Sequence, residues 1–169
     1  MSSKTKKVLL MRHAKSSWNN PGLRDFDRPL NKRGKKDAPR MGQYLKELQL
    51  IPDQIVSSPA ERAKSTILRV IGELGLPASK ITWDEDLYFN GSQSYIDAIR
   101  RADDSMDVVM IVGHNPMTED TISVLSAHTS QKAIKTATIA CFEFAVDSWK
   151  DVEFGPGTLK WIVGPKDLG

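Results

Sequence analysis

The chain has 169 residues, which is typical of one domain with its own hydrophobic core, and we expect a single domain over residues 1–169. A net charge of +3 is too balanced to indicate nucleic-acid binding, and no apolar run reaches the roughly 20 residues of a membrane span. The single cysteine, Cys141, excludes an internal disulfide and fits a reducing compartment. Only Val8–Met11 follows the basic N-terminus, too short a run for a signal peptide, so we expect a cytoplasmic protein.

Strand and helix patterns alternate along most of the chain. Apolar runs predict strands at Lys7–Met11, Gln54–Ser57, Ile81–Trp83 and Asp107–Val112. Apolar spacing predicts helices around Ala38, Met41, Leu45 and Leu48, from about Pro59 to Leu74, over 94–102 and over 116–127. The first of these helices contains Pro39 and Gly42, which weaken its pattern. Continuous apolar strands separated by helices favour a parallel sheet that is covered on both faces.

The pattern changes after about Thr136. The stretches "TATIACFEFAV" and "GTLKWIV" read as two strands joined by a turn-rich segment, and they predict a C-terminal antiparallel strand pair at one side of the sheet. The fold class is therefore α/β, a three-layer α/β/α sandwich with a mostly parallel central sheet. The loop from Lys15 to Leu30 is long for a connection, which favours a functional role for it.

Charged side chains follow three of the predicted strands. The first strand ends in Arg12-His13, the second leads to Arg62 in the first turn of a helix, and the last parallel strand ends at His114. Ligands of open parallel sheets bind at the carboxyl ends of the strands. We therefore expect these two arginines and two histidines to converge on one site.

The predicted helix starts at these strand ends favour an anionic ligand. Ser58 with Glu61 forms a Ser-x-x-Glu capping box, with Pro59 at the first helical position, and Asn115-Pro116 suggests the same pairing. Both helices would direct free N–H groups at the strand ends. Together with guanidinium and imidazole groups, such a pocket suits phosphate.

Other site chemistries find less support in the sequence. No G-x-x-x-x-G-K-[ST] motif is present, so a P-loop nucleotide site is not expected. Three histidines without a cysteine or carboxylate cluster argue against zinc, and Cys141 lies in a predicted strand. The third histidine, His128, has no strand-end context, so we expect it to be structural or exposed.

The motifs Arg12-His13, "SSPAERAKST" and "VGHNP", in this order, resemble the histidine phosphatase superfamily with its phosphoglycerate mutase-like fold. The segments "MRHAKSSW" and "DRPLNKRG" are similar to its SixA-like phosphohistidine phosphatase branch. The resemblance implies that His13 is the nucleophile, that Arg12, Arg62 and His114 hold the phosphoryl oxygens, and that no cofactor or metal is needed.

The sequence departs from the family pattern at three positions after His13. Ala14 stands where a glycine is frequent, and Lys15 stands where mutase-like members often have glutamate. Asn19 lies where some members have a phosphate-contacting asparagine, so the resemblance suggests it as a substrate-binding residue.

The segment "WDEDLYFNGS" follows the third predicted strand, where larger relatives carry an acidic proton donor. The resemblance makes Asp86 the first candidate for a general acid and Glu85 the second, and the alternative is that both are ordinary loop carboxylates. A phosphoramidate needs less help from an acid than a phosphoester does.

The expected function is hydrolysis of phosphohistidine, in a protein rather than free. The alternatives are a phosphatase for a small phosphoester, a mutase, and a non-catalytic phosphate-binding module. The expected partner is a phosphorylated protein or small phosphorylated molecule, with no nucleic acid and no membrane, and the oligomeric state stays open. The basic segment Arg24 to Arg40 fits a solvated helix face, or a rim for an anionic substrate or acidic partner.

Overall fold

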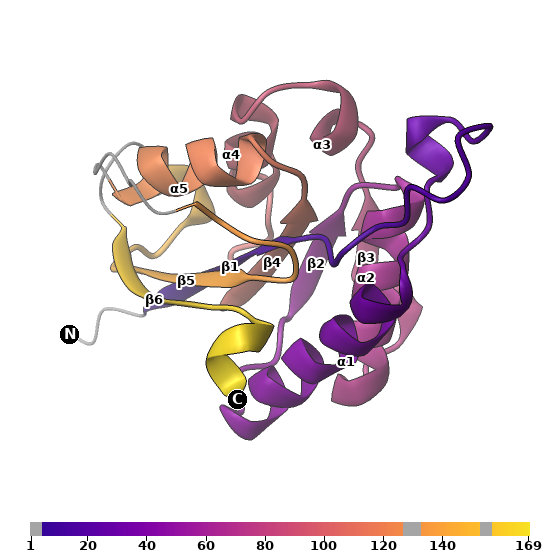
Figure 1. The fold of residues 1–169 in the computed structure, drawn as a ribbon. Helices are drawn as coiled ribbons and strands as arrows, with labels where there is room; N and C mark the ends of the chain where they lie inside the picture. The colour runs from indigo at the N-terminus through magenta and orange to yellow at the C-terminus, as the bar shows by residue number, and fades with distance from the viewer. Residues whose placement is uncertain (1–4, 127–132, 153–156) are drawn as a thin grey trace.

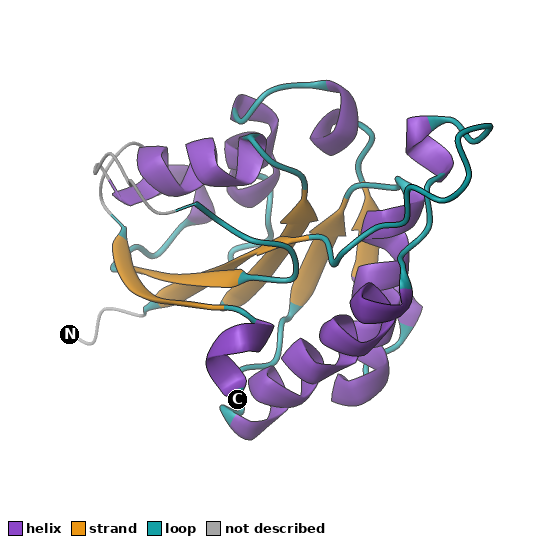
Figure 2. Cartoon of the chain, viewed as in Figure 1, coloured by secondary structure: helices purple, strands orange, loops and turns teal. Residues whose placement is uncertain are grey.

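The computed structural model describes residues 5–126, 133–152 and 157–169. Six strands form one sheet in the order β3-β2-β4-β1-β5-β6 (Figures 1 and 2). The strands are β1 (Lys6–Arg12), β2 (Gln54–Ser57), β3 (Ile81–Trp83), β4 (Val108–Gly113), β5 (Ile139–Phe144) and β6 (Thr158–Val163). The first four pair in parallel, whereas β5 is antiparallel to β1 and β6. The C-terminal antiparallel pair is therefore confirmed.

Helices cover both faces of the sheet. They are α1 (Lys32–Glu47), α2 (Glu61–Leu74), α3 (Asp86–Phe89), α4 (Gln93–Arg100) and α5 (Met117–Ser126). Figure 1 shows α1 and α2 on one face and α3, α4 and α5 on the other. The α/β/α sandwich expected from the sequence is confirmed. No helix in the described part of the chain is long and apolar enough to cross a membrane.

Strand β1 lies inside the sheet, between β4 and β5. Its side chains alternate between two buried clusters: Val8 and Leu10 pack on the side of α4 and α5, and Leu9 and Met11 pack on the side of α1 and α2. All four are at most 1% exposed. This double burial fixes the strand firmly, and with it the position of the residue that follows Arg12.

Helix α1 runs unbroken through Pro39 and Gly42, the two residues that weaken its sequence pattern. Gly42 lies against α2, where a Cβ would meet the Val70 carbonyl oxygen at 2.7 Å. The missing side chain thus lets the two helices approach closely, and tertiary packing outweighs helix propensity. The predicted core residue Leu48 lies just beyond the helix and is 44% exposed.

Two predicted helix caps are wrong. Helix α2 begins at Glu61 with Ala60 at the N-cap, so Ser58 lies before the cap position. The Ser58 hydroxyl accepts a hydrogen bond from the Ala60 N–H and contacts His114. Helix α5 begins at Met117, and the Asn115 side chain donates to the Ile134 carbonyl. The predicted helix end at Ala127, like His128, lies outside the described residues.

Candidate active site

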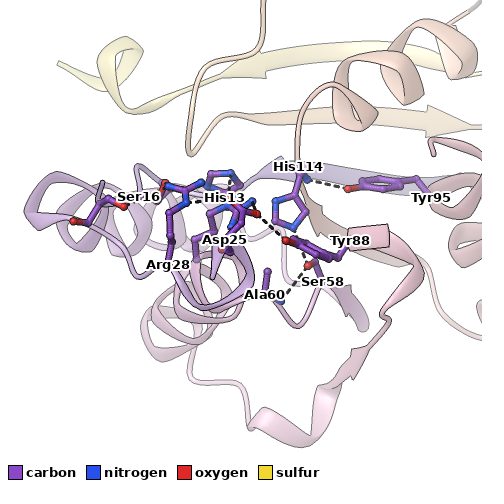
Figure 3. A network of polar contacts seen from close by, with 12 residues as sticks. His13, Ser16, Asp25, Arg28, Ser58, Ala60, Tyr88, Tyr95 and His114 are labelled. Carbon is purple, nitrogen blue, oxygen red and sulfur yellow. Dashed lines mark hydrogen bonds and ion pairs between the residues drawn. The ribbon is translucent and has the colours of Figure 1, made fainter. Parts of the chain in front are cut away.

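The strand ends bring the two predicted histidines together (Figure 3). His13 follows β1 directly, and its backbone N–H donates to the Gly113 carbonyl at the end of β4 at 3.0 Å. His114 is the next residue after Gly113, and the two imidazole centroids lie 5.2 Å apart. Arg62, in the first turn of α2, places its Nε 3.3 Å from His13 Nε2. The predicted convergence of these residues is therefore present in the structure.

The local backbone selects one tautomer of His13. Its Nδ1 lies 2.7 Å from the Ala14 carbonyl oxygen, which can only accept, so Nδ1 carries the proton and donates. Burial, opposed by that backbone hydrogen bond and reinforced by His114, lowers the His13 pKa to about 3. The ring is therefore neutral at physiological pH, and Nε2 presents its lone pair to Arg62.

His114 is buried in a second network behind the site. Its Nε2 lies 2.8 Å from the Ser58 hydroxyl, and its backbone N–H donates to Tyr95 Oη at 2.9 Å. Tyr95 packs so closely against Gly113 that a side chain there would overlap its ring. Burial and the nearby Arg62 charge lower the His114 pKa to about 3, so this ring is also neutral.

His114 Nδ1 is buried and has no hydrogen-bond partner among the described residues. A buried nitrogen without a partner is costly to the folded state and is uncommon in proteins. The orphaned nitrogen lies in the ring that faces His13, so a polar ligand at this position would satisfy it.

The loop residue Asp25 binds the guanidinium of Arg62. Arg62 Nη2 lies 3.0 Å from Asp25 Oδ2, and Arg62 Nη1 donates to the Asp25 carbonyl at 2.8 Å. The same carboxylate accepts hydrogen bonds from Arg28 Nε and from the Tyr88 hydroxyl. Burial alone would raise the Asp25 pKa, but the hydrogen bonds from Tyr88, Arg28 and Arg62 outweigh it and lower the pKa to about 2. Asp25 is therefore ionised at neutral pH.

Arg28 is a buried arginine on the loop side of the site. Its Nη1 donates to the Ser16 hydroxyl at 2.6 Å, and its guanidinium lies 3.6 Å from the centroid of the Trp18 ring. The side chain is 10% exposed. These contacts add a second guanidinium beside Arg62, which sequence reasoning did not single out.

A cavity of about 330 Å³ opens over these residues. Its lining includes all four predicted residues Arg12, His13, Arg62 and His114, and adds Lys15, Ser16, Trp18, Arg28, Asn115 and Thr136. Arg12 Nη1 donates to the Ile134 carbonyl at 2.9 Å, which holds the guanidinium at the wall. Three arginines and two neutral imidazoles around one hollow form a site for an oxyanion.

Two predicted site residues lie outside this cavity. The Asp86 carboxylate is exposed at the start of α3 and accepts a hydrogen bond from Asn90 at 2.8 Å. Asn19 is exposed, and its backbone N–H donates to Ser17 Oγ. Glu85, the second candidate acid, is also exposed. The structure therefore brings none of the three into the lining of the cavity.

Sequence reasoning missed Asp25, Arg28, Ser58 and Tyr88. The signal for the first two was the unusual length of the loop from Lys15 to Leu30, which contains a 3-10 turn at Asp25–Asp27. Arg28 also lies in the basic segment Arg24 to Arg40. Tyr88 lies on α3, a short helix that the sequence did not predict.

Among the residues that the structure describes, no group of three or more His, Cys, Asp or Glu side chains could hold a metal ion.

Comparisons with known proteins identify the family of this chain. The family profile of the histidine phosphatase superfamily (branch 1) matches residues 8–88. An uncharacterized chloroplastic protein of Arabidopsis thaliana is 31% identical over 175 residues, covering 95% of this chain and 78% of that protein. An uncharacterized protein of Mycobacterium tuberculosis is 32% identical, covering 88% and 96%. The chain belongs to the histidine phosphatase superfamily.

A solved structure narrows the resemblance within that superfamily. The crystal structure of an Agrobacterium tumefaciens protein assigned as the phosphohistidine phosphatase SixA superposes with a TM-score of 0.79 at 27% identity. The alignment covers 95% of this chain and 98% of that one. The predicted phosphoglycerate mutase-like fold and SixA-like resemblance are both confirmed.

Proposed function

We propose that this protein is a phosphatase that hydrolyses phosphohistidine in proteins through a phosphoryl group carried on His13. One observation supports the proposal above all. The Ala14 carbonyl accepts the Nδ1 proton of His13, and burial keeps the ring neutral, so Nε2 is a nucleophile in the resting site.

The reaction proceeds in two transfers. The lone pair of His13 Nε2 attacks phosphorus in line with the leaving group, the bond from phosphorus to the leaving nitrogen breaks, and that nitrogen takes a proton from solvent water, a proton that the attacking water of the second transfer returns to solvent. Water then attacks phosphorus, the bond to His13 Nε2 breaks, and inorganic phosphate leaves. Both transfers need positioning and charge stabilisation more than covalent assistance. The site supplies the charge with Arg12 and Arg62.

Arg62 must exchange partners when a phosphoryl group enters. In the structure its Nη1 and Nη2 donate to Asp25, and its Nε donates to His13 Nε2. The attacking nitrogen loses that donor as it bonds to phosphorus, and Nε then faces a phosphoryl oxygen. His114 contributes a further donor: when Ser58 donates to Nε2, the ring proton lies on the orphaned Nδ1.

A phosphohistidine substrate fits a cavity whose described lining residues include no aspartate or glutamate. Asp25 is ionised, with a pKa of about 2, and cannot donate a proton at neutral pH. Asp86 lies against Asn90, so its role as proton donor stays a prediction. An imidazole leaving group needs less protonation than an alkoxide. The similarity to the protein assigned as SixA supports the same substrate.

Trapping the intermediate tests the proposal. The wild-type protein, mixed with a protein carrying labelled phosphohistidine and quenched within its first turnover, is expected to hold acid-labile, base-stable label on His13. His13→Gln is expected to hold none and to lose hydrolysis. The matched control His114→Gln keeps the nucleophile and is expected to gain label more slowly.

Label or hydrolysis retained in His13→Gln would overturn the assignment of the nucleophile. Hydrolysis of small phosphoesters without hydrolysis of phosphohistidine would support the proposed mechanism but contradict the proposed substrate. Binding of phosphate without any turnover would instead indicate a non-catalytic module.

A further inference from the structure

A second cavity of about 380 Å³ adjoins the candidate active site. The two cavities share Arg12, Lys15 and Thr136 as lining residues, so the same side chains border both. A volume of this size is sufficient for a small organic group. The second cavity therefore lies next to the position expected for the phosphoryl group, within reach of the rest of a substrate.

The charge of the second cavity is unbalanced. Its lining includes Lys15, Lys135 and Lys166, and none of these ammonium groups has a hydrogen bond or ion pair to a residue in the described ranges. Both carboxylates of the lining are already engaged: Asp37 pairs with Arg33 at 3.4 Å, and Asp167 accepts the Gly164 N–H at 2.8 Å. Like charges that face one hollow repel each other, and a bound anion would relieve that repulsion.

The three lysines come from segments that lie far apart in the sequence. Lys15 follows the strand end of His13, Lys135 precedes β5, and Lys166 lies in the C-terminal 3-10 helix Pro165–Leu168. The lining between them contains the apolar side chains of Ile162 and Pro165. A lining that combines apolar and cationic residues suits an organic group that carries a negative charge.

We propose that this second cavity binds a second anionic group, a carboxylate or phosphate, of the molecule whose phosphoryl group is transferred. The inference deepens the proposed function and rests on its location of the phosphoryl site. The second anion comes either from a small phosphorylated acid or from an acidic side chain beside the phosphorylated residue of a protein. Substrates with a second acidic group are thus bound more tightly than counterparts whose phosphoryl group is their one acidic group.

Calorimetric binding to the His13→Ala protein tests this without turnover. The small-molecule probes are 3-phosphoglycerate and glycerol 3-phosphate, which differ in a carboxylate. The peptide probes are two phosphohistidine peptides with aspartate or asparagine beside the phosphorylated residue. In one of these two pairs, we expect the probe with the extra carboxylate to bind about five- to tenfold more tightly than its counterpart at low salt. This difference in affinity should shrink at high salt.

Replacing the two lysines that border only the second cavity locates the effect. Lys135→Gln/Lys166→Gln is expected to abolish the preference for the probe with the second acidic group. The affinity for the probe without that group is expected to stay unchanged. The matched control Lys36→Gln removes an exposed charge that lines neither cavity, and it is expected to keep the preference.

The pair that shows the preference identifies the source of the second anion. No preference in either pair, or a preference that survives in Lys135→Gln/Lys166→Gln, would overturn the inference. Because these are binding measurements, a protein that shows the preference but forms no phosphohistidine would refute the proposed function and leave the second anion site standing.

Discussion

The candidate active site has two sides that are built differently. On the strand side, two strand ends place the histidines: the Ala14 carbonyl holds the His13 ring, and the Gly113 carbonyl accepts the His13 backbone N–H. His114 follows the end of β4, and its ring contacts the Ser58 hydroxyl. On the loop side, side chains hold one another through the Asp25 carboxylate, which is half exposed and accepts from Arg28, Arg62 and Tyr88.

The difference indicates that the strand side positions the nucleophile, whereas the loop side binds the phosphoryl group. The strand side places a neutral nucleophile before any substrate arrives, as catalysis by positioning requires. On the loop side, the Asp25 carboxylate already holds the guanidinium groups of Arg28 and Arg62 in place. An entering phosphoryl group would therefore contact guanidinium groups that are already positioned. Arg62 belongs to both sides, since it contacts His13 Nε2 and Asp25.

The largest effect is expected where the two sides meet. Arg62→Gln should lower kcat/KM for a phosphohistidine protein by about 10²–10³, the usual cost of one well-aimed donor to a developing oxyanion. Arg28→Gln, on the loop side alone, should cost about tenfold or less, mainly through KM, since a partly exposed ion pair contributes little. Steady-state kinetics of the two purified variants measure both numbers.

Equal losses of kcat/KM in Arg62→Gln and Arg28→Gln would contradict the distinction between the strand side and the loop side. Arg62→Lys refines the result, because it keeps the charge and removes the planar fork. A loss close to that of Arg62→Gln would show that the two-pronged geometry matters more than the charge.

The strand side could be predicted from the sequence because its signals are local. An apolar run that ends in Arg12-His13 or His114 places these residues at a strand end, and parallel topology puts such ends at one edge of the sheet. The alternation of strands and helices was sufficient for the sandwich. The six-strand order, the short helix α3 and the starts of α2 and α5 needed the structure.

The loop side could not be predicted because its contacts join distant residues. Arg62 and Asp25 are 37 positions apart, and Tyr88 and Asp25 are 63 apart. Ser58 shows how such contacts defeat a local pattern: its Ser-x-x-Glu spacing fits a capping box, yet its hydroxyl contacts His114, 56 positions away. For Asp86 and Asn19, family position pointed to the site and the side chains lie outside its lining.

The pH dependence of stability should separate the two sides. Both histidines have pKa values of about 3 in the folded protein against an ordinary value of 6.5, so the unfolded chain binds more protons between these values. The free energy of unfolding should therefore fall as the pH falls below about 6.5, by at most about 1.4 kcal/mol per pH unit for each histidine. Urea unfolding at pH 7, 5.5 and 4.5 measures it.

The variants assign the two parts of that profile. His13→Gln should reduce the slope of the profile between pH 6.5 and 4.5 by about half, because His114 still contributes. Asp25, with its pKa lowered from 3.8 to about 2, contributes stability that is lost only below about pH 4. Asp25→Asn should thus leave the slope above pH 4.5 unchanged, and a change there would contradict this division.

The smallest effect is expected on α3, which carries both a residue of the loop side and the predicted acid. Tyr88→Phe removes one hydrogen bond to Asp25, raises the Asp25 pKa, and should lower kcat/KM for phosphohistidine by about two- to tenfold, matching a net contribution of about 0.5–1.5 kcal/mol. Asp86→Asn should slow phosphoester hydrolysis more than phosphohistidine hydrolysis. Equal losses on both substrates would contradict a role as proton donor, because an imidazole leaving group gains less from an acid than an alkoxide does.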